Sequence, residues 1–342
     1  MKAKKKLFLY LLLLYLSSFK LTTAEEKIGS SWHFDTKILR NIKLTKQKLI
    51  EEDNFKEINI LSENKIKLGS VFLERERAKA TIIFFHGFCP GGKEVFAPFV
   101  KIAPQNCNLL FVDMRSYGES NGPNFFLNLK NYGENDYKDI ENTVKFIHKK
   151  TNGLPILIFG WCSGAFHSAT ALIKLKETNI CDTLNIKGLI FDSGFGSILQ
   201  ISESPIFHIK HKYTPKLIAP LFGGNKKRAR KSLICKFTSF CLSSCLKFAG
   251  LFILPSIKKR ESRTNLYDKI NKIGNTPVLL IHAQDDQYSP WQLVKPLLKK
   301  ITNKDIWLIE EGKSSHAENH LKQKEEYQVR LKNWVDKVLL PA

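Results

Sequence analysis

The sequence of 342 residues is poor in acidic side chains, and it has no complete phosphate-binding motif. It has 32 Asp and Glu against 54 Lys and Arg, which gives a net charge of +22 at pH 7. Neither G-x-G-x-x-G nor a complete P-loop pattern occurs, so the glycine-rich stretch at 84–92 is not predicted to hold nucleotide phosphates. Its first apolar run, residues 7–19, is shorter than the roughly 18 to 20 residues of a spanning helix. Apolar residues nevertheless make up 43% of the chain, which is enough for a core.

The first 24 residues resemble a secretory signal peptide. A basic start (MKAKKK) precedes the apolar run, and a small-residue site ends at Ala24. We therefore expect cleavage near Ala24 and export, to a periplasm or to the outside. The alternative is an uncleaved segment that anchors the protein to a membrane. Removing these residues leaves 49 basic and 32 acidic residues, because the segment holds five lysines and no acid.

The remaining positive charge is concentrated between residues 197 and 272, which contain 16 Lys or Arg and 3 Asp or Glu. Within this stretch, two basic clusters flank a mostly apolar segment, residues 232–255. This pattern fits an amphipathic cap that contacts an anionic membrane surface through residues 210–260. The alternative is a cap that packs over an active site with its Lys and Arg in water. No specific nucleic-acid partner is expected.

Apolar strands alternate with helices from residue 57 onward, which predicts an α/β fold with a mostly parallel sheet and helices on both faces. The expected strands are 57–61, 65–74, 79–85, 108–113, 155–160, 187–192, 277–282 and 306–309, and the clearest helices are 137–147, 163–176 and 319–338. The predicted core comprises residues 57–196 and 276–342. A helical extension at 25–56 precedes it, and a basic cap insertion at 197–275 interrupts it.

The stretch "IFGWCSGAF" places Cys162 between Gly160 and Gly164, directly after a predicted strand. Such a turn lifts a nucleophile above a sheet, because glycines let the strand and the next helix approach closely. The helix that begins at Ser163 favours a thiolate at its N-terminus. The alternative is a buried structural thiol, since cysteine is a common buried small residue.

An acid and a histidine follow in the order that this kind of site requires. Asp286 comes after the strand at 277–282, and His316 comes after the strand at 306–309. Because the carboxyl ends of parallel strands share one edge of the sheet, the two side chains should meet Cys162 there. Asp285 and His320 are the rival candidates.

A glycine-rich loop, "FFHGFCPGG", follows the third strand and supplies free backbone N–H groups. The amides of Phe88 and Ser163 are the expected oxyanion-hole donors. Cys89 lies in the same loop, so a disulfide between Cys89 and Cys162 is a candidate redox switch. All seven cysteines follow the signal segment, and seven is odd, so complete pairing would leave one free.

Together these motifs resemble the α/β-hydrolase superfamily, in the branch of small lipases, thioesterases and acylpeptidase-like enzymes. The motifs are the "HG" after the third strand, "DMRSYGESNG" (113–122), "IFDSGFGS" (190–197) and the nucleophile–acid–histidine order. The resemblance implies an eight-stranded-type sheet and a cap at the insertion. Ser116 and Ala283 replace glycines of the family pattern. A cysteine nucleophile is similar to that of dienelactone hydrolases, and less so to that of polyhydroxyalkanoate synthases.

The sequence therefore predicts an exported acyl hydrolase with a Cys162–His316–Asp286 triad. Because sulfur is a good leaving group, thioesters, lactones or activated esters, including lipid-derived ones, are the expected small-molecule substrates. No metal and no cofactor is expected. An inactive hydrolase-like protein that binds lipid or polyanion through its basic cap is the first alternative, and an acyltransferase is the second.

Overall fold

The structure is a computed structural model that describes residues 45–88, 91–123, 135–198 and 265–340, with residues 221, 231, 232, 234 and 236. The chain divides into two compact units, Met1–Phe34 with Ser202–Lys259 and Asp35–Ile201 with Arg260–Ala342. All elements named below belong to the second unit. The predicted signal peptide, Cys89 and most of the predicted cap at 197–275, including most of the basic segment 210–260, lie outside the described residues. Among the helices that the structure describes, none has the length and apolarity to cross a membrane.

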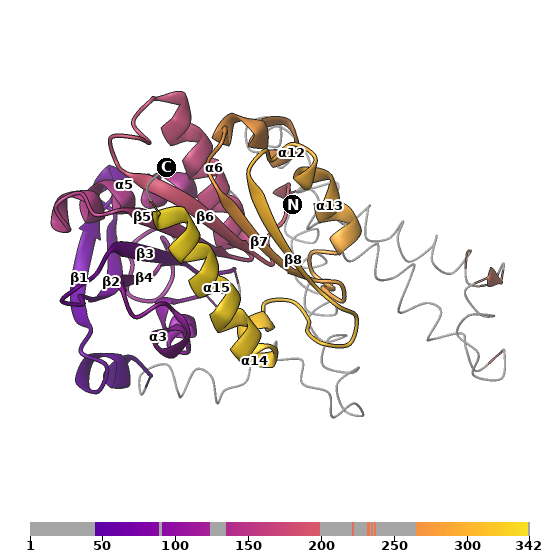
Figure 1. The fold of residues 1–342 in the computed structure, drawn as a ribbon, viewed down its shortest axis with the longest axis horizontal. Coiled ribbons are helices and arrows are strands. Elements are labelled where there is room, and N and C mark those ends of the chain that lie inside the picture. Colours follow the sequence, from indigo (N-terminus) through magenta and orange to yellow (C-terminus); the bar gives the residue numbers. More distant parts are fainter. Residues whose placement is uncertain are drawn as a thin grey trace, which may run out of the picture. The chain divides into compact units, whose positions relative to one another are not determined.

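The second unit is built on an eight-stranded sheet in the order β1-β2-β4-β3-β5-β6-β7-β8 (Figure 1). β2 pairs antiparallel with β1 and β4, and all later pairs are parallel. The strands are β1 (Lys56–Leu61), β2 (Lys67–Leu73), β3 (Ala80–Phe85), β4 (Cys107–Val112), β5 (Ile156–Trp161), β6 (Ile186–Asp192), β7 (Val278–Ala283) and β8 (Lys304–Ile309).

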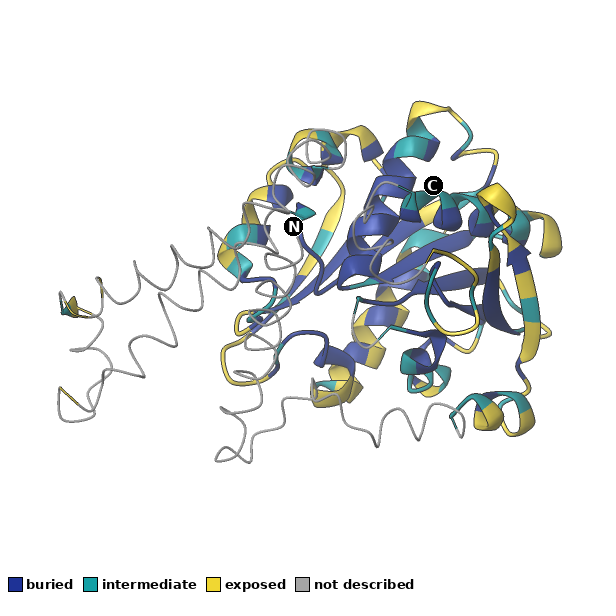
Figure 2. Ribbon diagram, turned by 180° about the vertical axis from the view of Figure 1, so that it is seen from behind, coloured by how far each residue is buried: buried dark blue, intermediate teal, exposed yellow. Residues whose placement is uncertain are grey.

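Helices cover both faces of the sheet, and each face has its own apolar core (Figures 1 and 2). On one face lie α5 (Asp136–Lys150), α6 (Ser163–Glu177), α12 (Leu266–Lys269) and α13 (Trp291–Leu298). On the other lie the helix at 45–51, α3 (Phe99–Ile102) and α15 (Lys324–Leu339). Neighbouring residues of one strand serve opposite cores: Ile83 packs in the first and Phe84 in the second. The central strands are therefore apolar on both faces, as their sequences predicted.

The predicted α/β-hydrolase fold is confirmed, with differences at its edges. Lys65 belongs to a 3-10 turn, Glu63–Lys65, rather than to the second strand. The predicted closing helix is two helices, α14 (Asn319–Lys322) and α15, because Gln323 leaves the helical conformation. Residues 265–275 fell within the predicted cap, but here Leu266 and Ile273 are buried in the core beside α6.

Two ion pairs hold the loop that follows β4. Arg115 donates to both carboxylate oxygens of Asp139 on α5, at 2.7 Å each. Two residues earlier, the buried carboxylate of Asp113 accepts a hydrogen bond from the ammonium of Lys93, with 2.7 Å between Oδ2 and Nζ. The first pair ties the loop to α5, and the second ties it to the segment that follows β3.

Candidate active site

Cys162 occupies a sharp turn between β5 and α6. Its φ of 56° and ψ of −115° lie in a region that side-chain-bearing residues rarely adopt. Its N–H donates to the carbonyl of Asp192, at 2.9 Å, and its thiol is buried. A strained, held residue between strand and helix has the geometry of a nucleophile elbow.

Both predicted elbow glycines are places where a side chain does not fit. A Cβ at Gly160 would lie 2.3 Å from the Cα of Ala165, and one at Gly164 would lie 2.1 Å from the carbonyl oxygen of Phe85. The obstructing atoms belong to the backbone, so they cannot turn aside as a side chain could. Strand, turn and helix can pack this tightly only with glycine at these two positions.

The structure brings His316 and Asp286 together. The ring Nδ1 of His316 donates to Oδ2 of Asp286 at 2.7 Å, and both side chains are buried. The other oxygen of Asp286 accepts the backbone N–H groups of Tyr288 and Ser289, at 2.9 and 2.7 Å. The carboxylate is therefore fixed on both oxygens, and it fixes the orientation of the imidazole.

The charges around His316 favour its protonated form. Burial lowers its pKa, but the charge of Asp286, the electrostatic interaction with Cys162 and the hydrogen bond to Asp286 raise that pKa well above its ordinary value. Burial raises the pKa of Asp286, but the charge of His316 and its hydrogen bond more than offset this effect. The pKa of Asp286 therefore lies below its ordinary value. Because Nδ1 is held by the carboxylate, Nε2 is the ring atom left to interact with the thiol of Cys162. The three side chains thus form one connected group.

Neither rival takes part in this group. Asp285 is exposed, and its carboxylate accepts the N–H of Gly312 instead of contacting His316. His320 stacks on Phe99 with the ring centroids 4.9 Å apart, and among the described residues its Nδ1 has no hydrogen-bond partner. Burial lowers the pKa of His320 to about 4, so it stays neutral near pH 7.

The loop after β3 passes close to the thiol. A Cβ at Gly87 would lie 3.0 Å from Cβ of Cys162 and 3.6 Å from its sulfur. Phe88, the next residue, is one predicted oxyanion donor. Ser163, the other, is the first residue of α6, so its N–H has no acceptor within the helix. Both predicted donors thus adjoin Cys162, and their role in binding an oxyanion stays a prediction.

His86 controls the direction of the Gly87–Phe88 peptide. The N–H of Met114 donates to Nε2 of His86 at 2.9 Å, so the ring proton is on Nδ1, which donates to the Gly87 carbonyl at 2.7 Å. Burial lowers the pKa of His86, which keeps this tautomer neutral. Since the C=O and N–H of a trans peptide point in opposite directions, the Phe88 N–H points away from His86.

A network around Asp192, the last residue of β6, was not predicted from the sequence. One carboxylate oxygen accepts the hydroxyl of Ser193 and the side-chain amide of Asn319, both at 2.8 Å, and the other accepts the hydroxyl of Tyr327 at 2.8 Å. The Ser193 hydroxyl also accepts the N–H of Ala317, at 3.2 Å. These bonds hold the loop that carries His316. The signal in the sequence was "IFDSGFGS", whose aspartate follows a buried strand.

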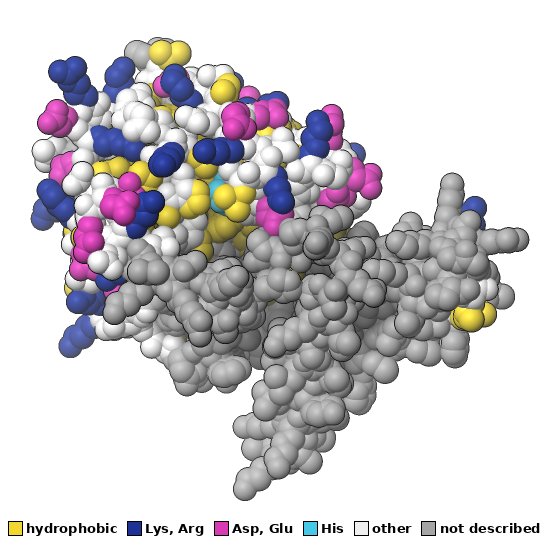
Figure 3. All heavy atoms as spheres, turned by 90° about the horizontal axis from the view of Figure 1, so that it is seen from below, with side chains coloured by type: hydrophobic (Ala, Val, Ile, Leu, Met, Phe, Trp, Pro, Cys, Tyr) yellow, Lys and Arg dark blue, Asp and Glu magenta, His cyan; other side chains and the backbone are white. Residues whose placement is uncertain are grey.

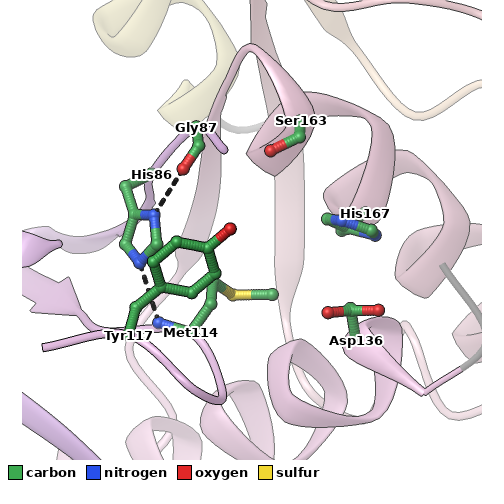
Figure 4. Close-up of a pocket in the computed structure, with 7 residues that line it drawn as sticks. All are labelled: His86, Gly87, Met114, Tyr117, Asp136, Ser163 and His167. Atoms are coloured by element: carbon green, nitrogen blue, oxygen red, sulfur yellow. Dashed lines mark hydrogen bonds between the residues drawn. The ribbon is translucent and has the colours of Figure 1, made fainter. Parts of the chain in front are cut away.

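A small cavity of about 10 Å³, room for about one water molecule, lies beside the elbow (Figure 4). Figure 4 shows His86 and Tyr117 on one side of it and His167 with Asp136 on the other. Ser163, the residue after the cysteine, also lines it. A small cavity with polar and apolar lining therefore adjoins the predicted oxyanion site.

The described surface in Figure 3 mixes Lys and Arg with Asp and Glu around a group of hydrophobic side chains. Of residues 210–260, which were expected to meet an anionic membrane, only 221, 231, 232, 234 and 236 are described, so the expectation stays a prediction. Of the seven cysteines, Cys107, Cys162 and Cys181 are described, and none of these three forms a disulfide. Burial raises the pKa of the Cys107 thiol to about 12 and that of Cys181 to about 11, so both are inert structural thiols.

Fold and geometry together define a protein with the α/β-hydrolase fold whose elbow carries cysteine. No family model matches the sequence, and no curated protein matches it. Among solved structures, the chain is similar to an esterase from Pyrococcus furiosus, with 17% identity over 84% of this chain and 91% of that one (TM-score 0.56). It is also similar to a proline iminopeptidase from Mycobacterium smegmatis, with 12% identity over 83% and 99% (TM-score 0.56). A third is a membrane phospholipase A, described as a bacterial virulence factor, with 14% identity over 98% and 99% (TM-score 0.55).

Proposed function

We propose that this protein is an exported acyl hydrolase in which Cys162 is the nucleophile, His316 the acid–base group and Asp286 the residue that orients it. The observation that carries the proposal is the buried Asp286–His316 hydrogen bond of 2.7 Å, whose imidazole interacts with a cysteine held at a φ of 56°. A structural thiol needs neither the strained turn nor the charged partner.

In the first half-reaction, the thiolate of Cys162 attacks the acyl carbonyl carbon and the carbonyl oxygen gains the negative charge. The N–H groups of Phe88 and Ser163 are the proposed donors to that oxygen. When the tetrahedral adduct collapses, the bond to the leaving alcohol or thiol breaks, and imidazolium gives that group its proton. The product is a thioester on Cys162.

In the second half-reaction, Nε2 of His316 takes a proton from a water molecule while the water oxygen attacks the thioester carbonyl. The carbon–sulfur bond then breaks and releases the acid with Cys162 as thiolate, which restores the ion pair. Because a thiolate leaves readily from the first adduct, substrates with equally good leaving groups react best. Thioesters, lactones and activated esters satisfy this condition.

Lipid-derived thioesters and activated esters are the first natural class to test, because one structural neighbour is described as a phospholipase and the basic segment fits an acidic lipid surface. We propose export and contact with anionic membrane on the same sequence grounds. Sedimentation with vesicles of phosphatidylglycerol and of phosphatidylcholine tests the membrane proposal. Equal binding to both would contradict it.

Hydrolysis of a panel of acyl esters and thioesters, read by release of the leaving group, tests the activity. We expect turnover by the wild type and a loss of at least about 10³-fold in Cys162→Ala and His316→Ala. Cys162→Ser retains an attacking atom and is expected to fall between them and the wild type. If all three variants hydrolyse the panel as the wild type does, the triad is refuted. If none of the proteins reacts, the inactive binding protein becomes the better account.

A further inference from the structure

The segment after β3 carries a lysine with an unusual environment. Lys93 is fully buried, although lysine is almost never buried unless it is paired. Its ammonium donates to Asp113 at 2.7 Å and to Glu119 at 3.0 Å, and Glu94 lies 3.5 Å away. Desolvation lowers the pKa of Lys93, but these carboxylates more than offset it, so the pKa is raised and the side chain is charged.

Lys93 binds Asp113 twice, once through its side chain and once through its backbone. Its N–H donates to Oδ1 at 2.7 Å while the ammonium occupies Oδ2. The N–H of Glu119 also donates to Oδ2, at 2.9 Å. Asp113 thus joins the segment after β3 to both ends of the loop at 113–119. That loop is itself anchored at Arg115 by the ion pair with Asp139.

A second contact joins the same two segments closer to the thiol. The ring of Tyr117 packs edge-on against His86, with the ring centroids 4.8 Å apart. On its other side it covers Gly91, where a Cβ would come within 2.2 Å of the ring. The predicted donor Phe88 lies between these two points, so the loop after β4 holds the chain before and after it.

We propose that Lys93, through its ion pair with Asp113, is a positioning residue for the oxyanion loop. The lysine does not touch substrate. Lys93 holds the C-terminal end of the loop that follows β3, and His86 holds its N-terminal end. Together they keep the Phe88 amide at the position where the oxyanion forms. A preorganised donor stabilises the transition state because it does not need to move during the reaction.

This inference rests on the proposed function, and its test uses two reactions of the same thiol. A p-nitrophenyl ester acylates the cysteine through an oxyanion and releases p-nitrophenolate, which is read as a burst. Iodoacetamide alkylates the same sulfur with loss of iodide, and no oxyanion forms. A displaced oxyanion loop should therefore slow acylation and leave alkylation alone.

For Lys93→Met we expect the acylation rate constant to fall about 10²-fold, since small misplacements in active sites have effects of this size. The alkylation rate should stay within about twofold. Since removing one member of a buried ion pair is strongly destabilising, the double variant Lys93→Met with Asp113→Asn is measured beside it. The matched control is Arg75→Met, which removes a partly buried cation that donates to the carbonyls of Pro104 and Cys107 at the start of β4, the opposite edge of the sheet from the oxyanion segment.

Acylation lowered in both Lys93 variants but not in Arg75→Met would support the inference. Equal acylation in all proteins, or acylation and alkylation that fall together, would overturn it. The proposed function fails separately, when the wild type itself gives no burst while it is still alkylated.

Discussion

Replacing Asp192 by asparagine should change how the free energy of unfolding depends on pH. The carboxyl group is fully buried, and burial raises its pKa from an ordinary value of 3.8 to about 6, although Tyr327, Ser193 and Asn319 donate hydrogen bonds to it. The folded protein therefore holds this proton more tightly than the unfolded chain. An asparagine keeps the acceptor oxygen for Ser193 and Asn319 and cannot ionise.

The size of the effect follows from the two pKa values of Asp192. The difference between 3.8 and about 6, at 1.36 kcal/mol for each pH unit, comes to about 3 kcal/mol. Between these two pH values the folded state binds more protons than the unfolded state, so the free energy of unfolding falls as pH rises. The stabilisation is fully present below about pH 4 and is lost as pH passes through about 6.

Urea unfolding of the wild type and of Asp192→Asn at half-unit steps from pH 4 to 8 measures this difference. We expect the free energy of unfolding of Asp192→Asn, relative to that of the wild type, to rise by about 3 kcal/mol as the pH increases from 4 to 8. Most of this change should fall between pH 4 and 6. A constant difference between the two proteins over the whole range would refute the reasoning. A gain of the opposite sign would show that the folded state prefers the carboxylate.

Three further outcomes follow from the geometry. Asp286→Asn should lower the hydrolysis rate by about 10²- to 10⁴-fold, since it removes the negative charge that orients His316 and stabilises its protonated form. Asp285→Asn should stay within about twofold in the same assay, and equal losses in the two variants would contradict the assignment of Asp286. Because protonated His316 favours the thiolate, His316→Ala should slow alkylation by iodoacetamide at pH 7 by about tenfold or more, and an unchanged rate would mean that no ion pair forms. Gly164→Ala should reduce the free energy of unfolding in urea by about 3 kcal/mol or more. Gly312→Ala, where no described atom lies within 4 Å of the added Cβ, should reduce the free energy of unfolding by only about 1 kcal/mol. Similar reductions in the Gly164 and Gly312 variants would mean that the elbow relaxes around a side chain.

Much of the fold could be predicted because its strands are short apolar runs in a regular alternation with helices. The α13 helix was not predicted, since Pro290 and Pro296 at its start and within it suggest a turn. The break at Gln323 was not predicted because glutamine has ordinary helix propensity, and its φ of −125° and ψ of 43° appear only in the structure.

The site could be predicted in part, because chain order placed Cys162, Asp286 and His316 at strand ends. The sequence favoured Asp286 and kept Asp285 as a rival, since adjacent aspartates differ in direction and not in chemistry; in the structure Asp286 contacts His316 and Asp285 contacts Gly312. The tautomer of His86 and the double use of Asp113 by Lys93 were beyond sequence reasoning. Both depend on loops that meet only when the sheet is assembled.

The most direct test of the central claim is peptide mapping by mass spectrometry after an acid quench of the wild type with a p-nitrophenyl ester. The account predicts one acyl group per chain, carried by the peptide that contains Cys162, and none on that peptide in His316→Ala at the same early time. An acyl group on any other residue, or equal labelling of Cys162 without His316, would contradict it.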